Sequence, residues 1–255
     1  MPSTYGPIRT LLFDMDGVLV DVSRSYRRAI AETVGHFTGA APDAARIQSY
    51  KDRGGFNDDW HLSHQMIADA GEDVPLAEVV AAFQSRYRGE GFGGYIASEP
   101  PMVRTSVLKA LAERHGALGL VTGRPEEEAR FTLQRFGWAD LFGSVVAMEQ
   151  QAGRGKPDPF GLDLCLEELG RPNMGAVYVG DTGDDQRAAI AAGCMPVGVV
   201  PPGLDYRSHA RTLIQSGAVV VLSTPEDLQS LVATLGRAEP DPPAPKSSGS
   251  TSRAA

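Results

Sequence analysis

Two aspartates that follow a short apolar run are the residues of this sequence best suited to chemistry. Residues 10–13 form a run typical of a buried strand, and Asp14, Asp16 and Gly17 come directly after it. Two carboxylates at the end of a buried strand need compensation, which a metal ion or hydrogen-bonded partners can supply. A strand-end turn with solvated aspartates has a similar local sequence. Residues elsewhere in the chain must therefore decide whether these aspartates form a functional site or a solvated turn.

Similar polar groups follow three later strands that the sequence predicts. They are Thr122 and Gly123, Lys156 in the loop after the third strand, and Gly180, Asp181, Asp184 and Asp185. The carboxyl ends of parallel strands face one side of a sheet, so these groups should converge on Asp14 and Asp16. A carboxylate can attack phosphorus, acidic oxygens can hold a hard divalent cation, and a lysine, a hydroxyl and backbone amides can bind phosphate oxygens. The set predicts phosphoryl transfer.

Alternating strands and helices would bring these polar residues to one edge of a sheet. Strands are expected at 10–13, 117–121, 144–147, 176–179, 195–200 and 219–222, and helices at 103–115, 125–136, 158–169, 184–192, 204–216 and 225–235. This order predicts an α/β fold with a doubly wound parallel sheet. No segment of residues 21–88 is predicted as a strand, and helices are expected at 25–37, 44–50, 60–70 and 75–87, which predicts an inserted all-helical cap. We expect a core of residues 1–20 and 98–237, a cap of residues 21–97, and a disordered tail at 238–255.

Composition limits the function classes. The chain has 255 residues, a formal net charge of −8 and a pI of about 5.2, which argues against partners such as nucleic acid or a membrane surface. No apolar stretch reaches the ~18 residues of a membrane span, and the first nine residues do not form a secretory signal. Cys165 and Cys194 predict buried reduced thiols. We expect a cytoplasmic monomer or homodimer that binds a small phosphorylated metabolite.

The order and spacing of the motifs resemble those of the haloacid dehalogenase (HAD) superfamily. The matching segments are FDMDGVL at 13–19, VTGR at 121–124, KPDP at 156–159 and VGDTGDD at 179–185. The similarity covers residues 8–235. A cap between the first and second motifs is the layout of phosphoglycolate phosphatases and β-phosphoglucomutases. The resemblance implies a Rossmann-like core with this cap.

The resemblance assigns the chemistry to the first motif. It implies that Asp14 is the nucleophile and a ligand of Mg²⁺. It implies that Asp16 protonates the leaving oxygen, then deprotonates the attacking water, and binds the metal through its backbone carbonyl. Dehalogenases of the family lack an acid at the second position, because a halide needs no proton. The presence of Asp16 therefore favours phosphate ester chemistry, which combines acid–base with covalent catalysis.

The other three motifs would support that chemistry. By the same resemblance, Thr122 and the amide of Gly123 bind the transferring phosphoryl group. Lys156 offsets the charge between nucleophile and phosphate. Asp181 ligates Mg²⁺, and Asp185 supports the metal directly or through another ligand. The role of Asp184, which lies between them, stays open.

One cap loop has an unusual composition for a solvated surface. Lys51, Arg53 and Asn57 lie there beside a Gly-Gly pair and Trp60. In the enzymes that the chain resembles, this part of the cap selects the substrate, so Lys51, Arg53 and Asn57 are expected to contact it. No residue decides between a sugar phosphate, phosphoglycolate and an amino-alcohol phosphate such as histidinol phosphate.

Three functions compete. The first is a Mg²⁺-dependent phosphatase that forms an aspartyl-phosphate, and the second is a phosphomutase of the β-phosphoglucomutase type. The third is a non-catalytic binding module, but none of the catalytic positions is lost. Arg124 has no assigned role, and it could pair with the acidic run at 126–128.

Overall fold

The sheet is the centre of the fold. A computed structural model describes residues 6–51, 53 and 58–235, so Asn57 and the expected tail lie outside the described residues. Six parallel strands pair in the order β3-β2-β1-β4-β5-β6. They are β1 (Thr10–Phe13), β2 (Leu118–Val121), β3 (Phe142–Val146), β4 (Ala176–Gly180), β5 (Met195–Val199) and β6 (Val220–Leu222). The predicted parallel sheet is confirmed.

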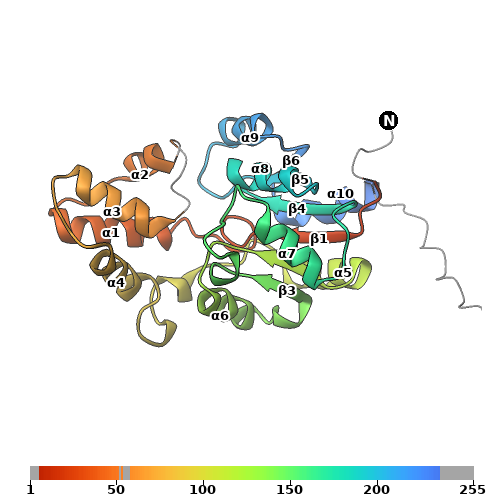
Figure 1. The fold of residues 1–255 in the computed structure, drawn as a ribbon, viewed down its shortest axis with the longest axis horizontal. Helices are drawn as coiled ribbons and strands as arrows, with labels where there is room; N and C mark the ends of the chain where they lie inside the picture. Colours follow the sequence, from red (N-terminus) through yellow and green to blue (C-terminus); the bar gives the residue numbers. More distant parts are fainter. Residues whose placement is uncertain (1–5, 52, 54–57, 236–255) are drawn as a thin grey trace, which may run out of the picture.

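Helices cover both faces of this sheet (Figure 1). They are α5 (Thr105–His115), α6 (Glu126–Phe136), α7 (Phe160–Glu168), α8 (Gly183–Ala191), α9 (Tyr206–Gln215) and α10 (Leu228–Leu235). Leu11 and Phe13 of β1 share a core with α5, α6 and α10, while Leu12 packs with α7 and α8. The opposite directions of neighbouring side chains explain why β1 is buried throughout. The chain is doubly wound, as expected from the sequence.

Strand β3 begins and ends earlier than the predicted range of 144–147. Phe142 starts the strand because its ring packs edge-on against Phe13, with 6.4 Å between the ring centroids. Ala147 falls outside the strand because its N–H donates to the Gln150 side chain, 3.1 Å away. Tertiary packing and one side-chain hydrogen bond therefore set both ends of this edge strand.

The cap is an all-helical unit with a core of its own. Its helices are α1 (Tyr26–Thr38), α2 (Ala44–Lys51), α3 (Asp59–Asp69) and α4 (Leu76–Tyr87). Ile30, Leu62 and Phe83 are completely buried between them. Within the described ranges the chain also forms five short 3-10 segments: η1 (Glu90–Phe92), η2 (Tyr95–Ser98), η3 (Ala139–Leu141), η4 (Glu149–Gln151) and η5 (Pro225–Asp227).

The two crossings between cap and core run side by side. The N–H of Asp21 donates to the Pro100 carbonyl at 3.0 Å, and the N–H of Met102 donates to the Leu19 carbonyl at 2.8 Å. Figure 1 shows the cap beyond the edge at which β1 leaves the sheet. The cap therefore lies over the edge where the predicted site residues gather.

A buried carboxylate of the core contacts the cap. Glu128 of α6 accepts a hydrogen bond from the Gln84 side chain at 2.7 Å, and the Tyr26 hydroxyl lies 3.4 Å from its other oxygen. Burial raises the pKa of Glu128 to about 7, although Gln84 and Arg124 favour the charged form. The folded protein therefore keeps a proton on Glu128 that the unfolded chain loses at lower pH.

This proton makes the contribution of Glu128 to stability depend on pH. Because its pKa rises from 4.5 to about 7 on folding, stability falls as pH increases across that interval. We expect Glu128→Gln to gain on the order of 1–3 kcal/mol relative to wild type between about pH 5 and about pH 8. Urea unfolding at both pH values measures this. Glu113→Gln, an exposed substitution on α5, serves as control. An equal difference between Glu128→Gln and wild type at both pH values would contradict the prediction.

Candidate active site

The site begins where β1 ends. The N–H of Asp14 donates to the Val179 carbonyl at 2.9 Å, which holds the aspartate against β4. Gly17 turns the chain with φ of 70°, and a Cβ atom there would collide with the Asp181 carboxylate. Only glycine combines this positive φ with so close an approach. The sequence Asp-x-Asp-Gly therefore lets the first strand leave the sheet directly beside Asp181.

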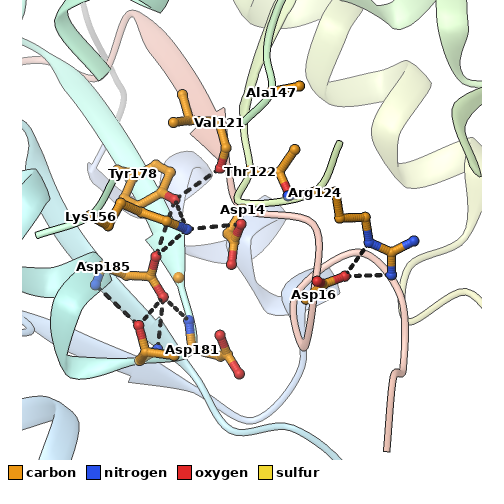
Figure 2. A network of polar contacts seen from close by, with 12 residues as sticks. Asp14, Asp16, Val121, Thr122, Arg124, Ala147, Lys156, Tyr178, Asp181 and Asp185 are labelled. Carbon is orange, nitrogen blue, oxygen red and sulfur yellow. Dashed lines mark hydrogen bonds and ion pairs between the residues drawn. The ribbon is translucent and has the colours of Figure 1, made fainter. Parts of the chain in front are cut away.

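Lys156 connects two of the acidic residues. Its Nζ lies 3.0 Å from Oδ1 of Asp14 and 2.6 Å from Oδ1 of Asp185. It also donates to the Tyr178 hydroxyl at 3.0 Å (Figure 2). Tyr178 comes from β4, and its hydroxyl is 3.2 Å from both the Val121 carbonyl and Asp185. The lysine is thus held between the ends of β1, β2 and β4.

The surroundings give the three carboxyl groups of the cluster different pKa values. Burial raises the pKa of Asp14 to about 7, although Lys156 favours its charged form. Burial also opposes ionisation of Asp185, but Lys156 and Thr182 hold the pKa of Asp185 below its usual value. Burial and the charges of Asp185 and Asp14 raise the pKa of Asp181 well above its usual value. The cluster holds more negative charge than one lysine compensates.

This donor set fits a hard divalent cation. Oxygens of Asp14, Asp181 and Asp185 lie within 4.8 Å of one another. The Asp181 carboxylate accepts no hydrogen bond from the residues that the structure describes, so its charge has no direct partner there. Ca²⁺ and Mg²⁺ are typically bound by carboxylate oxygens of this kind, whose negative charge the protein does not balance.

The turn before α8 fixes this part of the cluster. Oδ2 of Asp185 accepts from the Thr182 hydroxyl at 2.6 Å and from the backbone N–H groups of Thr182 and Asp181 at 2.8 and 3.1 Å. His209 lies 2.7 Å from the Asp181 carbonyl. Asp184, whose role the sequence left open, instead pairs with Arg187 at 2.5 Å. Adjacent acids in this motif therefore have different partners.

Thr122 and Gly123 lie at the end of β2. The Thr122 hydroxyl is buried and accepts a hydrogen bond from the N–H of Arg124 at 3.2 Å, so its own proton is free to donate. The Gln151 side chain donates to the Thr122 carbonyl at 2.7 Å. Gly123 is exposed, and space is open around its Cα. The pair therefore offers a hydroxyl and an accessible backbone at the site.

Asp16 lies apart from the lysine cluster. Figure 2 shows its carboxylate on the far side of Asp14 from Lys156, turned toward Arg124. Oδ1 of Asp16 accepts from Nε of Arg124 at 2.5 Å. Arg124 also binds Glu99, so it forms ion pairs with these two acids, and from the run at 126–128 that the sequence suggested it acts on Glu128 through its charge.

Sequence reasoning missed Tyr178 and Glu99 and gave Arg124 no role. Tyr178 carries the one polar side chain in the strand AVYVG, and a lone hydroxyl in a buried strand indicates a hydrogen-bonding role. Glu99 gave no comparable signal, because it precedes two prolines in a segment that resembles a linker.

Two of the predicted cap residues have partners within the cap. Lys51 pairs with Asp59 at 2.8 Å. Burial raises the pKa of Asp59, and the charge of Asp16 adds to this effect. The Arg53 guanidinium instead lies 4.5 Å above the Tyr50 ring. Asn57 lies outside the described residues.

Comparisons with known proteins agree with this geometry. A sequence model of the haloacid dehalogenase-like hydrolases matches residues 8–193. The chain is 32% identical to a phosphoglycolate phosphatase of Rhodospirillum rubrum over 91% of its own length and 92% of that protein. A predicted phosphoglycolate phosphatase from Haemophilus somnus has the same fold, with a TM-score of 0.72, 18% identity and coverage of 88% and 97%.

Another relative is a longer protein. The chain is 34% identical to an imidazoleglycerol-phosphate dehydratase of Phytophthora nicotianae over 91% of its own length. It spans only about half of that protein, 52% of its length. The dehydratase name therefore need not describe the matched half.

The chain belongs to the haloacid dehalogenase-like hydrolases. The predicted enzyme class, a phosphoric monoester hydrolase of this family, is confirmed. Among the described residues, no helix combines the length and apolar character that crossing a membrane requires.

The charge imbalance at Asp181 predicts a response to Mg²⁺. Asp181→Asn relieves like-charge repulsion, so it should raise the melting temperature in EDTA by about 2–6 °C. Saturating Mg²⁺ should stabilise the wild type by roughly 3 kcal/mol at about 100 times its Kd, and Asp181→Asn should lose most of this gain. Asp184→Asn is the matched control, since its carboxylate pairs with Arg187. Differential scanning calorimetry with and without Mg²⁺ measures both effects. If Asp181→Asn and wild type gain equally from Mg²⁺, Asp181 is not a ligand.

Proposed function

We propose that the protein is a Mg²⁺-dependent phosphatase that hydrolyses a small phosphorylated metabolite through an aspartyl-phosphate on Asp14. The observation that supports this most directly is the contact of Asp14 with Lys156, at 3.0 Å, beside the carboxylates of Asp181 and Asp185. Lys156 orients the nucleophile and lowers the repulsion that a phosphate dianion would meet. A divalent cation held by Asp14, Asp181 and Asp185 would neutralise further phosphate charge.

The residues around Asp14 divide the work of the reaction. An oxygen of Asp14 attacks phosphorus, and the bond from phosphorus to the leaving oxygen breaks. The Thr122 hydroxyl and the Gly123 amide bind phosphoryl oxygens, because both lie at the open end of β2. Asp16 gives its proton to the leaving oxygen and then takes a proton from the water that cleaves the aspartyl-phosphate.

The cap suggests a substrate with a second charged group. Lys51 and Asp59 form an ion pair in the cap, the charge of Asp16 acts on Asp59, and each member of the pair could exchange its partner for a group of the substrate. A carboxylate such as that of phosphoglycolate would bind Lys51, in keeping with the name of the Rhodospirillum rubrum relative. An ammonium such as that of histidinol phosphate would bind Asp59. The Phytophthora nicotianae relative, named for an imidazole-bearing phosphate, is a reason to test this second group.

A panel of phosphate esters tests the activity. With Mg²⁺, the wild type should release phosphate from at least one small monoester, and Asp14→Asn should lower kcat by at least about 10⁴-fold because no aspartyl-phosphate forms. The panel contains phosphoglycolate, histidinol phosphate and a sugar phosphate, and phosphate release is followed colorimetrically. A parallel assay of sugar phosphate isomerisation, primed by the bisphosphate, tests the phosphomutase alternative. Phosphate release by Asp14→Asn at the wild-type rate would contradict the proposal.

Two cap variants test the substrate class. Lys51→Met should raise KM for phosphoglycolate about tenfold or more, and Asp59→Asn should do the same for histidinol phosphate, since each loses a charged hydrogen bond. Arg24→Met, an exposed substitution in the same cap, is the control. Steady-state kinetics on both esters provide the measurement. If neither variant changes KM for the preferred ester, the Lys51–Asp59 pair does not contact the substrate.

A further inference from the structure

Arg124 is a buried cation between two carboxylates from distant parts of the chain. Its side chain is 0% exposed, and Nη2 lies 2.8 Å from Oε2 of Glu99. Nε and Nη2 both contact Oδ1 of Asp16, and Nη1 donates to the Thr132 hydroxyl at 3.1 Å. One guanidinium thus fixes Asp16 in a single orientation, because its planar fork meets both acids at once.

Glu99 anchors this arginine to both crossings between cap and core. Its Oε1 accepts from the Ser25 hydroxyl at 2.5 Å and from the Tyr87 hydroxyl at 3.1 Å. Ser25 lies at the start of α1, just after the first crossing, and Glu99 itself belongs to the second. Arg124 is therefore bound, through Glu99, to the segments on which the cap is mounted.

Two stacked rings close the guanidinium off from water. The rings of Tyr26 and Tyr87 lie 4.1 Å apart, and the Arg124 guanidinium carbon is 5.4 Å and 6.0 Å from their centres. Both tyrosines come from the cap, whereas Arg124 comes from the core. The cap therefore covers the arginine that holds Asp16.

The two carboxylates differ in access. The Asp16 side chain is 32% exposed, whereas the Glu99 side chain is 0% exposed. Glu99 balances the buried charge of Arg124, and Arg124 holds Asp16 through Oδ1, so the second oxygen of Asp16 can meet a substrate oxygen while the pair stays intact. Buried Glu99 therefore holds Arg124 in place, and the partly exposed Asp16 is the acid that can meet the substrate.

We infer that Arg124 is the positioning residue of the acid–base group: held by Glu99, it aims the Asp16 carboxyl at the leaving oxygen and later at the water. This inference rests on the proposed function and adds a residue to it. Arg124 transfers no proton itself. In the first step the Asp14–phosphorus bond forms, the phosphorus–oxygen bond of the ester breaks, and the Asp16 proton goes to that oxygen. In the second step water attacks phosphorus, the Asp14–phosphorus bond breaks, and the water proton goes to Asp16.

The dependence on the leaving group distinguishes positioning from a structural role. p-Nitrophenolate leaves without a proton, so the first step on p-nitrophenyl phosphate does not need Asp16, whereas hydrolysis of the aspartyl-phosphate does. Rapid mixing of Arg124→Met with this ester should give a burst of about one p-nitrophenolate per enzyme, at a rate within about threefold of wild type. Steady-state turnover should fall about 30-fold or more, as expected for misaligned general base catalysis. On an alkyl phosphate, which needs the acid in the first step, no burst of alcohol should appear.

Controls keep this result interpretable. Asp16→Asn should show the same pattern, and Thr132→Val, which removes a contact of Arg124 but not the pair with Asp16, should behave like wild type. If circular dichroism shows that Arg124→Met does not fold, Arg124→Lys keeps the buried charge without the fork, and it should keep the burst with turnover between wild type and Asp16→Asn.

Two outcomes overturn the inference. One is an equal loss of burst rate and turnover in the folded Arg124 variant, which is the mark of a structural role. The other is turnover unchanged from wild type. Failure of the proposed function itself looks different, because Asp14→Asn would then turn over p-nitrophenyl phosphate as fast as the wild type.

Discussion

Negative charge buried at one edge of a parallel sheet is the constraint on which the rest of this structure depends. Asp14, Asp181 and Asp185 come together there because parallel strands and the turns after them bring their polar residues to the same edge. One lysine, tied to two of the acids and to Tyr178, offsets part of the charge. An arrangement of this kind is costly without a cation and well suited to a phosphate bound through one.

The fold keeps this charge in place by burial on both sides. Strand β1 lies in the middle of the sheet, and its side chains alternate between two apolar cores. A strand held in this way cannot shift along its neighbours without exposing one of its faces. The position of Asp14 is therefore set by the apolar packing of the strand that directly precedes it.

Two cations divide the site into two parts. Lys156 lies on one side of Asp14, where it serves the nucleophile and the phosphoryl group, and Arg124 lies on the other side with Asp16. Lys156 contacts Asp14, Asp185 and Tyr178 of the core, whereas Arg124 is bound through Glu99 to the segments that carry the cap. Movement of the cap therefore has a direct path to the acid–base group. The separation suits a reaction in which phosphate is held fixed while a proton moves.

The sequence by itself determined the alternation of strands and helices, the helical insertion after the first strand, and the residues that meet at the edge of the sheet. Those features depend on local patterns and on one general rule of parallel sheets, so they can be predicted without coordinates. Only the tertiary structure decided the partners of Arg124, because Asp16 lies 108 residues away along the chain and Glu99 lies in a segment without regular pattern. It also decided that Tyr178 holds Lys156, which joins residues 22 positions apart. Contacts of this kind arise from the packing of whole elements, and no periodicity in the sequence records which side chains that packing brings together.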